Sequence, residues 1–132
     1  MFSHNGKKPN QDRTLLYYNK ESGYLLAGVF DGHGNEGHMI ASFIRSEFLL
    51  SFVELSKDEN VQKDCLMERA LHVAEEKLTE NAAINSKRSG STAAIILLHP
   101  DCRDHISLYS SNVGDSEYYF TILIISLDVL FQ

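Results

Sequence analysis

Cysteine is scarce in this sequence, and its two cysteines show no pairing pattern. Cys65 and Cys102 lie in unlike surroundings and form no C-x-x-C unit. The first eight residues, MFSHNGKK, lack the apolar run of a secretory signal. Together these absences predict a reducing, intracellular setting, in the cytoplasm or the nucleus.

Positive charge is also in short supply. The chain carries 12 lysine and arginine residues against 18 aspartate and glutamate residues, so its net charge is -6 and its pI is near 5.4. It therefore lacks the basic footprint that nucleic acid or an anionic membrane surface requires, and partners with basic surfaces are favoured. With 132 residues, of which 43% are apolar, the chain fits one globular domain.

The hydrophobic pattern predicts an α+β fold. Apolar runs predict two strands that pair as a hairpin and, later in the chain, two further strands. Between these pairs, apolar residues recur at i, i+3 and i+4, which predicts two long helices. The expected strands are residues 13–18, 24–30, 93–98 and 105–110, with a turn at 99–104, and the expected helices are 37–53 and about 60–83.

Two of the expected strands end in an aspartate beside a glycine. Asp31 and Gly32 follow the apolar strand at 24–30, which is expected to deliver them to a loop, and Asp115 follows the fourth strand. Carboxylate and carbonyl oxygens are ligands for a hard cation such as Mg²⁺ or Mn²⁺. His33 is placed to act as a proton donor beside such a cation. This pattern predicts a hydrolytic metal site.

Four short segments resemble, in order and spacing, motifs of the metal-dependent type 2C serine/threonine protein phosphatases. They lie at residues 8–12 (KPNQD), 28–34 (GVFDGHG), 89–93 (SGSTA) and 112–116 (NVGDS). The resemblance covers about residues 3–116. It implies a β-sandwich of antiparallel sheets flanked by helices, with a two-metal site between the sheets, and a phosphoprotein substrate.

The resemblance also implies a role for each matching residue. Asp31 looks like the carboxylate that bridges the two metals, and Gly32 like the donor of a backbone oxygen to one of them. Asp12 looks like the acid that holds a metal-bound water, and Asp115 like a ligand of an additional, weaker metal. His33 is expected to protonate the leaving alkoxide. Lys7 stands where the family often holds the substrate phosphate.

The chain departs from the family after Asp115. The family continues for about as much chain again and supplies further aspartates, whereas here only Glu117 and Asp128 follow. About half of the inner ligands are missing, so we expect a truncated sandwich with little or no activity alone. Unpaired edges and an uncovered apolar face also predict self-association or a complementing chain.

The expected division is therefore an N-terminal half of a phosphatase-like domain at 1–116 and a divergent apolar tail at 117–132. For this tail a buried strand is favoured over non-homologous read-through. A membrane anchor is disfavoured, because the apolar run is shorter than the roughly 20 residues of a spanning helix and Asp128 interrupts it. The last residues, LDVLFQ, also resemble a protease tag remnant.

Other interpretations stay open. Residues 32–37 match the G-x-G-x-x-G fingerprint of dinucleotide-binding proteins. A noncatalytic pseudophosphatase or an interaction fragment is a further alternative. Taken singly, Asp31 and Asp12 are also typical turn residues, His33 is typical of a solvent-facing loop, and Lys7 of a solvated charge.

Overall fold

The computed structural model describes residues 9–102 and 105–116. The chain begins with an antiparallel hairpin of β1 (Asp12–Tyr18) and β2 (Leu25–His33). The Asn19 side chain closes the turn by accepting hydrogen bonds from the backbone N–H groups of Glu21 (2.9 Å) and Ser22 (3.0 Å). Gly23 completes the turn with a φ of 74°, a conformation that glycine adopts at little cost. The predicted hairpin is confirmed.

Two long helices follow, as predicted. α1 covers Gly37–Leu55 and α2 covers Lys63–Glu80. The second helix is shorter at both ends than the expected 60–83. It starts later because Asp58 accepts hydrogen bonds from Asn60 and holds a turn between the helices, and it ends at Glu80 because the backbone of Asn81 is extended. Of the helices in the described ranges, none combines the length and the apolar character that crossing a membrane requires.

The chain then returns to the sheet. A short 3-10 turn, η1 (Ser86–Arg88), leads into β3 (Gly90–Ser91), and β4 (Ala93–Cys102) and β5 (His105–Val113) complete a five-stranded antiparallel sheet in the order β1-β2-β4-β5, with β3 paired to β2. The turn expected from residue 99 is wrong at its start, because β4 continues to Cys102. Pro100 stands beside a register shift in the β4–β5 ladder, where a strand tolerates proline.

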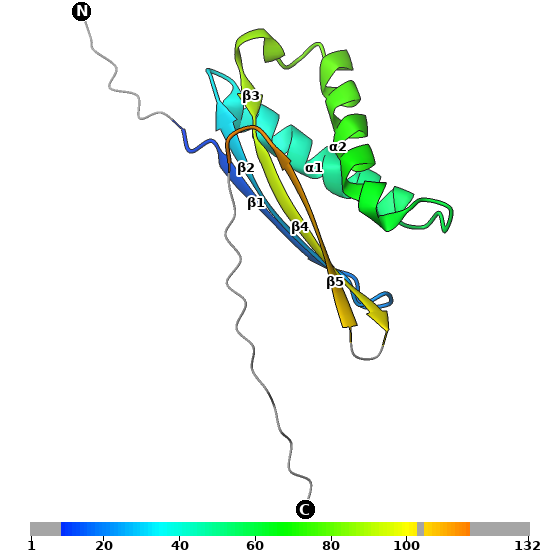
Figure 1. Cartoon of the computed structure of the whole chain (residues 1–132). Helices are drawn as coiled ribbons and strands as arrows, with labels where there is room; N and C mark the ends of the chain where they lie inside the picture. The colour runs from blue at the N-terminus through cyan, green and yellow to red at the C-terminus, as the bar shows by residue number, and fades with distance from the viewer. Residues whose placement is uncertain (1–8, 103–104, 117–132) are drawn as a thin grey trace, which may run out of the picture.

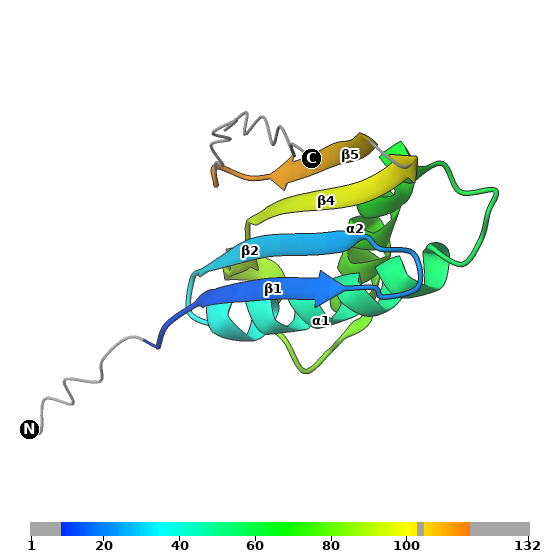
Figure 2. The same ribbon diagram turned by 90° about the horizontal axis from the view of Figure 1, so that it is seen from below.

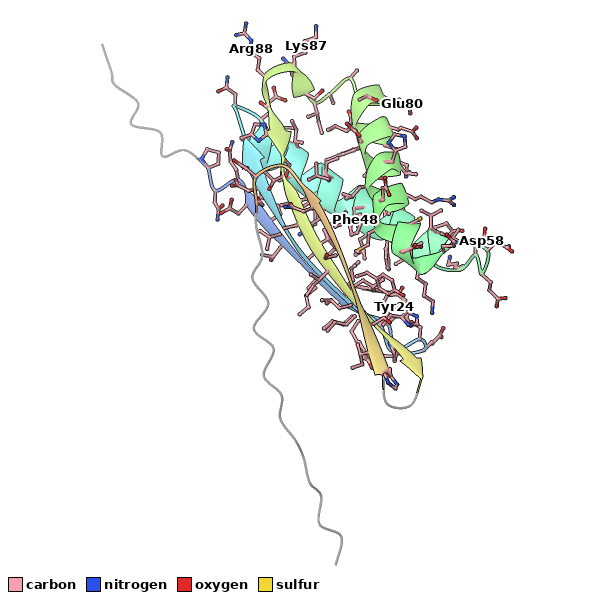
Figure 3. The ribbon with its side chains drawn as sticks, in the orientation of Figure 1. Tyr24, Phe48, Asp58, Glu80, Lys87 and Arg88 are labelled. Carbon is pink, nitrogen blue, oxygen red and sulfur yellow. The ribbon has the colours of Figure 1, made fainter. Side chains whose placement is uncertain are left out.

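Both helices pack on the same face of the sheet, and the core lies between the helices and the sheet (Figure 1). Phe30, Leu26 and Ile95 point from the strands into this core and are fully buried. Figure 3 shows Phe48 of α1 between the helices and the sheet, where its ring centroid lies 6.1 Å from that of Phe30. Removing such a ring costs about 3–5 kcal/mol in a protein core, so this face holds the fold together.

The opposite face of the sheet, which we call the open face, is apolar and exposed. No helix in the described ranges lies on this face, which is turned toward the viewer in Figure 2. Its large exposed side chains range from 46% exposed at Val29 and Leu108 to 76% at Leu16; Tyr18 and Ile106 lie between them. The α+β class and the antiparallel sheet with two helices are confirmed, and the described residues hold one sheet.

Candidate functional site

The hairpin register places Asp12 directly opposite Asp31. The Asp31 backbone faces away from β1: its carbonyl accepts from the Thr92 N–H (2.8 Å), while the next residue, Gly32, donates its N–H to Gln11 (3.2 Å). Asp12 and Asp31 are therefore a pair without hydrogen bonds between them, in which Cα atoms lie about 4.5 Å apart and side chains are closest. Both side chains are exposed at the end of the open face.

Asp31 lies within a strand, and the expectation of a loop is wrong. β2 continues to His33 because Gly32 and His33 pair with Ser91 and Gly90 of β3. A strand alternates its side chains, so Asp31 and His33 point to the same face. The carboxylate pair and the imidazole therefore share the open face.

Backbone contacts hold Asp12 in place. Its N–H donates to the side-chain oxygen of Asn10 (2.8 Å), so Asn10 and not Asp12 forms the turn. The guanidinium of Arg13 donates to the carbonyl oxygens of Asp12 (2.7 Å) and Asn10 (3.0 Å), and its Nε donates to Ser42 Oγ (2.7 Å) in α1. The start of β1 is thus fixed to the start of α1 through the Arg13 side chain.

Three glycines allow the backbone to fold closely around the β2 end. A Cβ added to Gly32 would lie 2.3 Å from the carbonyl oxygen of Gly37, and one added to Gly34 would lie 2.3 Å from that of Arg88. Gly34 also has a φ of 83°. A Cβ added to Gly37 would lie 2.6 Å from the carbonyl carbon of Gly32, so these contacts account for all three glycines of the G-x-G-x-x-G pattern.

The dinucleotide-binding alternative is wrong. A dinucleotide fold requires a parallel strand after the first helix. Here α1 is followed by α2, and β2 is antiparallel to every strand that it pairs with in the described residues.

The His33 ring lies over Gly90, since a Cβ on Gly90 would come within 2.7 Å of His33 Nε2. The side chain is exposed, as in the solvent-facing loop considered from the sequence, but His33 lies in strand β2 and not in a loop. Lys87 and Arg88 extend from the turn before β3 at this end of the molecule (Figure 3).

Among the described residues, Asp115 is connected to the pair through Ser116 and Thr92. It follows Gly114, which has a φ of 93°, and its side chain is exposed. The next residue, Ser116, shares a hydrogen bond with Thr92 Oγ1, and the same oxygen accepts from the Asp31 N–H (3.2 Å). Within residues 9–102 and 105–116 no three histidine, cysteine or acidic side chains are grouped to hold a metal ion. Lys7 lies outside the described residues.

The register brings together the carboxylates of Asp12 and Asp31, which have the right chemistry for a hard divalent cation but are too few. Two facing carboxylates and the backbone carbonyl of Gly32 are oxygen donors of the kind that Mg²⁺ and Mn²⁺ take, whereas Mg²⁺ takes about six. Gln11 is not among the site residues predicted from the sequence, yet its Oε1 is buried without a hydrogen-bond partner among the described residues. Its place next to Asp12 in the first motif is the sequence signal that points to it.

Comparison with known proteins identifies the family of this chain. The sequence model of the family described as Protein phosphatase 2C matches residues 3–124. This chain belongs to the protein phosphatase 2C family. The predicted membership is confirmed, and the match continues past Asp115 into the apolar tail.

Several curated members of the phosphatase 2C family are similar to this chain. "Probable protein phosphatase 2C 64" of Oryza sativa subsp. japonica is 30% identical over 88% of this chain, and "Probable protein phosphatase 2C 72" of Arabidopsis thaliana is 32% identical over 81% of it. The alignments cover only 28% and 34% of those relatives. The chain therefore spans about a third of the length of the phosphatases that it resembles.

Proposed function

We propose that this chain supplies the N-terminal part of the active site of a Mg²⁺- or Mn²⁺-dependent protein serine/threonine phosphatase. The observation that carries the proposal is the facing of Asp12 and Asp31 at an exposed strand end. Like charges placed directly opposite on a sheet are destabilising unless something compensates them. A shared divalent cation is the compensation that fits both the donor chemistry and the family.

Each residue then has a role in hydrolysis. Asp31 and the Gly32 carbonyl would hold the cation, and Asp12 would accept a hydrogen bond from a water beside it. Bound divalent cations activate water and neutralise charge that develops at phosphorus. His33, on the same face as Asp31, donates a proton to the departing serine or threonine oxygen.

The proposal also gives supporting roles to Asp115 and Lys7. Asp115 contributes to an additional, weaker cation position, and Lys7 holds the substrate phosphate. The substrate is a phosphoprotein inside the cell. Nucleic acid and membrane are not proposed as partners, because the net charge is -6.

The small number of donors limits what the chain does alone. Affinity for a divalent cation falls as charged ligands are removed. We therefore expect weak or absent turnover by residues 1–132 alone, and full activity only when further carboxylates join Asp12 and Asp31.

The experiment measures hydrolysis of a phosphothreonine peptide and of phenyl phosphate in Mn²⁺, with and without EDTA. A low, Mn²⁺-dependent rate that Asp31→Asn abolishes supports the proposal. Glu21→Gln is the matched control, because it removes one negative charge at the far end of the hairpin. A rate that Asp31→Asn and Glu21→Gln reduce equally, or that EDTA leaves intact, refutes it.

A second function, that of a noncatalytic interaction fragment, is favoured by the open face. Five large apolar side chains lie exposed there, and exposed apolar patches mark interaction sites. Sedimentation velocity distinguishes the two functions. Association that persists in Asp31→Asn, with no Mn²⁺ binding by the parent chain, supports the interaction fragment, whereas a monomer at all concentrations argues against it.

A further inference from the structure

We propose that Thr92 is the positioning residue of this site, holding the Asp31 strand end and the Asp115 turn together through one hydroxyl group. The proposal rests on the proposed function, because positioning matters only if the two aspartates hold cations. It adds a residue that touches neither cation nor substrate. Thr92 lies between β3 and β4, at the point where the chain passes from one to the other.

Thr92 makes hydrogen bonds to both backbone polar groups of Asp31, its N–H and its carbonyl. The Thr92 N–H donates to the Asp31 carbonyl oxygen (2.8 Å), and the Asp31 N–H donates to Thr92 Oγ1 (3.2 Å). In a regular β-ladder the Asp31 N–H would donate to a backbone carbonyl, whereas here it donates to a side-chain oxygen. The direction of the Asp31 carboxylate therefore depends on the Thr92 hydroxyl.

The same hydroxyl reaches the second aspartate turn. Thr92 Oγ1 shares a hydrogen bond with Ser116 Oγ, one residue after Asp115. A hydroxyl can accept one hydrogen bond and donate or accept another, so both contacts are satisfied together. Gly114 packs on the other side of Thr92, where an added Cβ would lie 2.9 Å from Thr92 Cγ2.

Burial makes this hydroxyl difficult to replace by water. Thr92 is only 6% exposed. Removing its oxygen leaves the Asp31 N–H without its partner and releases the 115–116 turn at the same time. Residues that orient a metal ligand without touching the metal typically change metal affinity when substituted, by 10-fold to 100-fold.

The experiment compares Thr92→Val, which keeps the shape and removes the hydroxyl, with Thr92→Ser, which keeps the hydroxyl. Binding of Mn²⁺ is followed by the electron paramagnetic resonance signal of the free ion, and amide hydrogen exchange is followed at Asp31 and Ser116. Ile95→Val, in the buried core of β4, is the control for general loss of stability.

We expect Thr92→Val to weaken Mn²⁺ binding by about tenfold and to speed exchange at both amides. Thr92→Ser should restore both, and Ile95→Val should change neither. Binding in Thr92→Val equal to that of the parent chain, or lost equally in Ile95→Val, overturns the positioning role.

Asp31→Asn separates this inference from the proposed function. If Asp31→Asn abolishes binding while Thr92→Val leaves it intact, only the role of Thr92 is refuted. If the parent chain binds no Mn²⁺, or if Asp31→Asn binds as well as the parent, the proposed function is refuted together with the inference.

Discussion

Replacing Asp12 by Asn tests the facing carboxylates in the absence of any activity. Side chains directly opposite on antiparallel strands have Cβ atoms about 5 Å apart. Two unit charges at this distance repel by about 0.8 kcal/mol in water, and salt at 0.1 M reduces this to about 0.5 kcal/mol. In EDTA we therefore expect Asp12→Asn to raise the free energy of unfolding by about 0.5 kcal/mol, or the Tm by about 2–4 °C.

Adding Mn²⁺ should reverse this order. A cation that binds only the folded parent chain stabilises it by about 1.4 kcal/mol at ten times its Kd. Asp12→Asn has lost one of the two carboxylates, so its gain should be smaller. The parent chain should therefore be the less stable of the two in EDTA and the more stable in Mn²⁺.

Urea unfolding of the parent chain, Asp12→Asn and Glu21→Gln measures both effects. Glu21→Gln makes the same change in net charge at the hairpin turn, with no carboxylate opposite it. If Asp12→Asn is no more stable than this control in EDTA, the two carboxylates do not face each other. If it is more stable but Mn²⁺ produces no reversal, they face each other without holding a cation.

Three further predictions concern the rest of the fold. Gly32→Ala should destabilise the chain by at least about 2 kcal/mol, because its Cβ would lie 2.3 Å from a backbone carbonyl oxygen of α1, and an unchanged urea midpoint would contradict this. The negative charge of Asp64 raises the pKa of the Cys65 thiol, so alkylation of Cys65, measured in a Cys102→Ser background, should have a pH midpoint above that of an ordinary cysteine. Asp64→Asn should lower this midpoint, and an unchanged midpoint would refute the assigned cause. Leu16→Glu should reduce self-association in sedimentation velocity with a stability change within about 0.5 kcal/mol, because this side chain is 76% exposed, and unaltered association would exclude the open face as the contact.

The elements of the fold could be predicted because their signals are local. The apolar spacing of α1 repeats every turn, and the hairpin turn is marked by Asn19 and Gly23. Strand ends were less predictable. β2 and β4 both run further than expected, because their final residues are held by pairing with β3 and β5 and not by their own side-chain pattern.

The candidate site could be predicted in its residues but not in its geometry. Asp12, Asp31 and His33 stand in recognisable motifs, and the structure places all three side chains on one face. The hydrogen bond between Thr92 and Asp31 could not be predicted, because it joins positions 61 residues apart. A hydroxyl in a sequence carries no sign of a partner at that distance.

The order of strands and helices, the family, and the oxygen-donor residues follow from the amino-acid sequence, because periodicity and short motifs are properties of neighbouring residues. Three features depend on strand register and on the pairing of β3 with β2. They are the carboxylates that face each other, the face of the sheet that stays open, and the hydroxyl that bonds to Asp31. Register depends on contacts across the whole sheet, and a slip of one residue turns every side chain to the other face. Only the tertiary structure sets it.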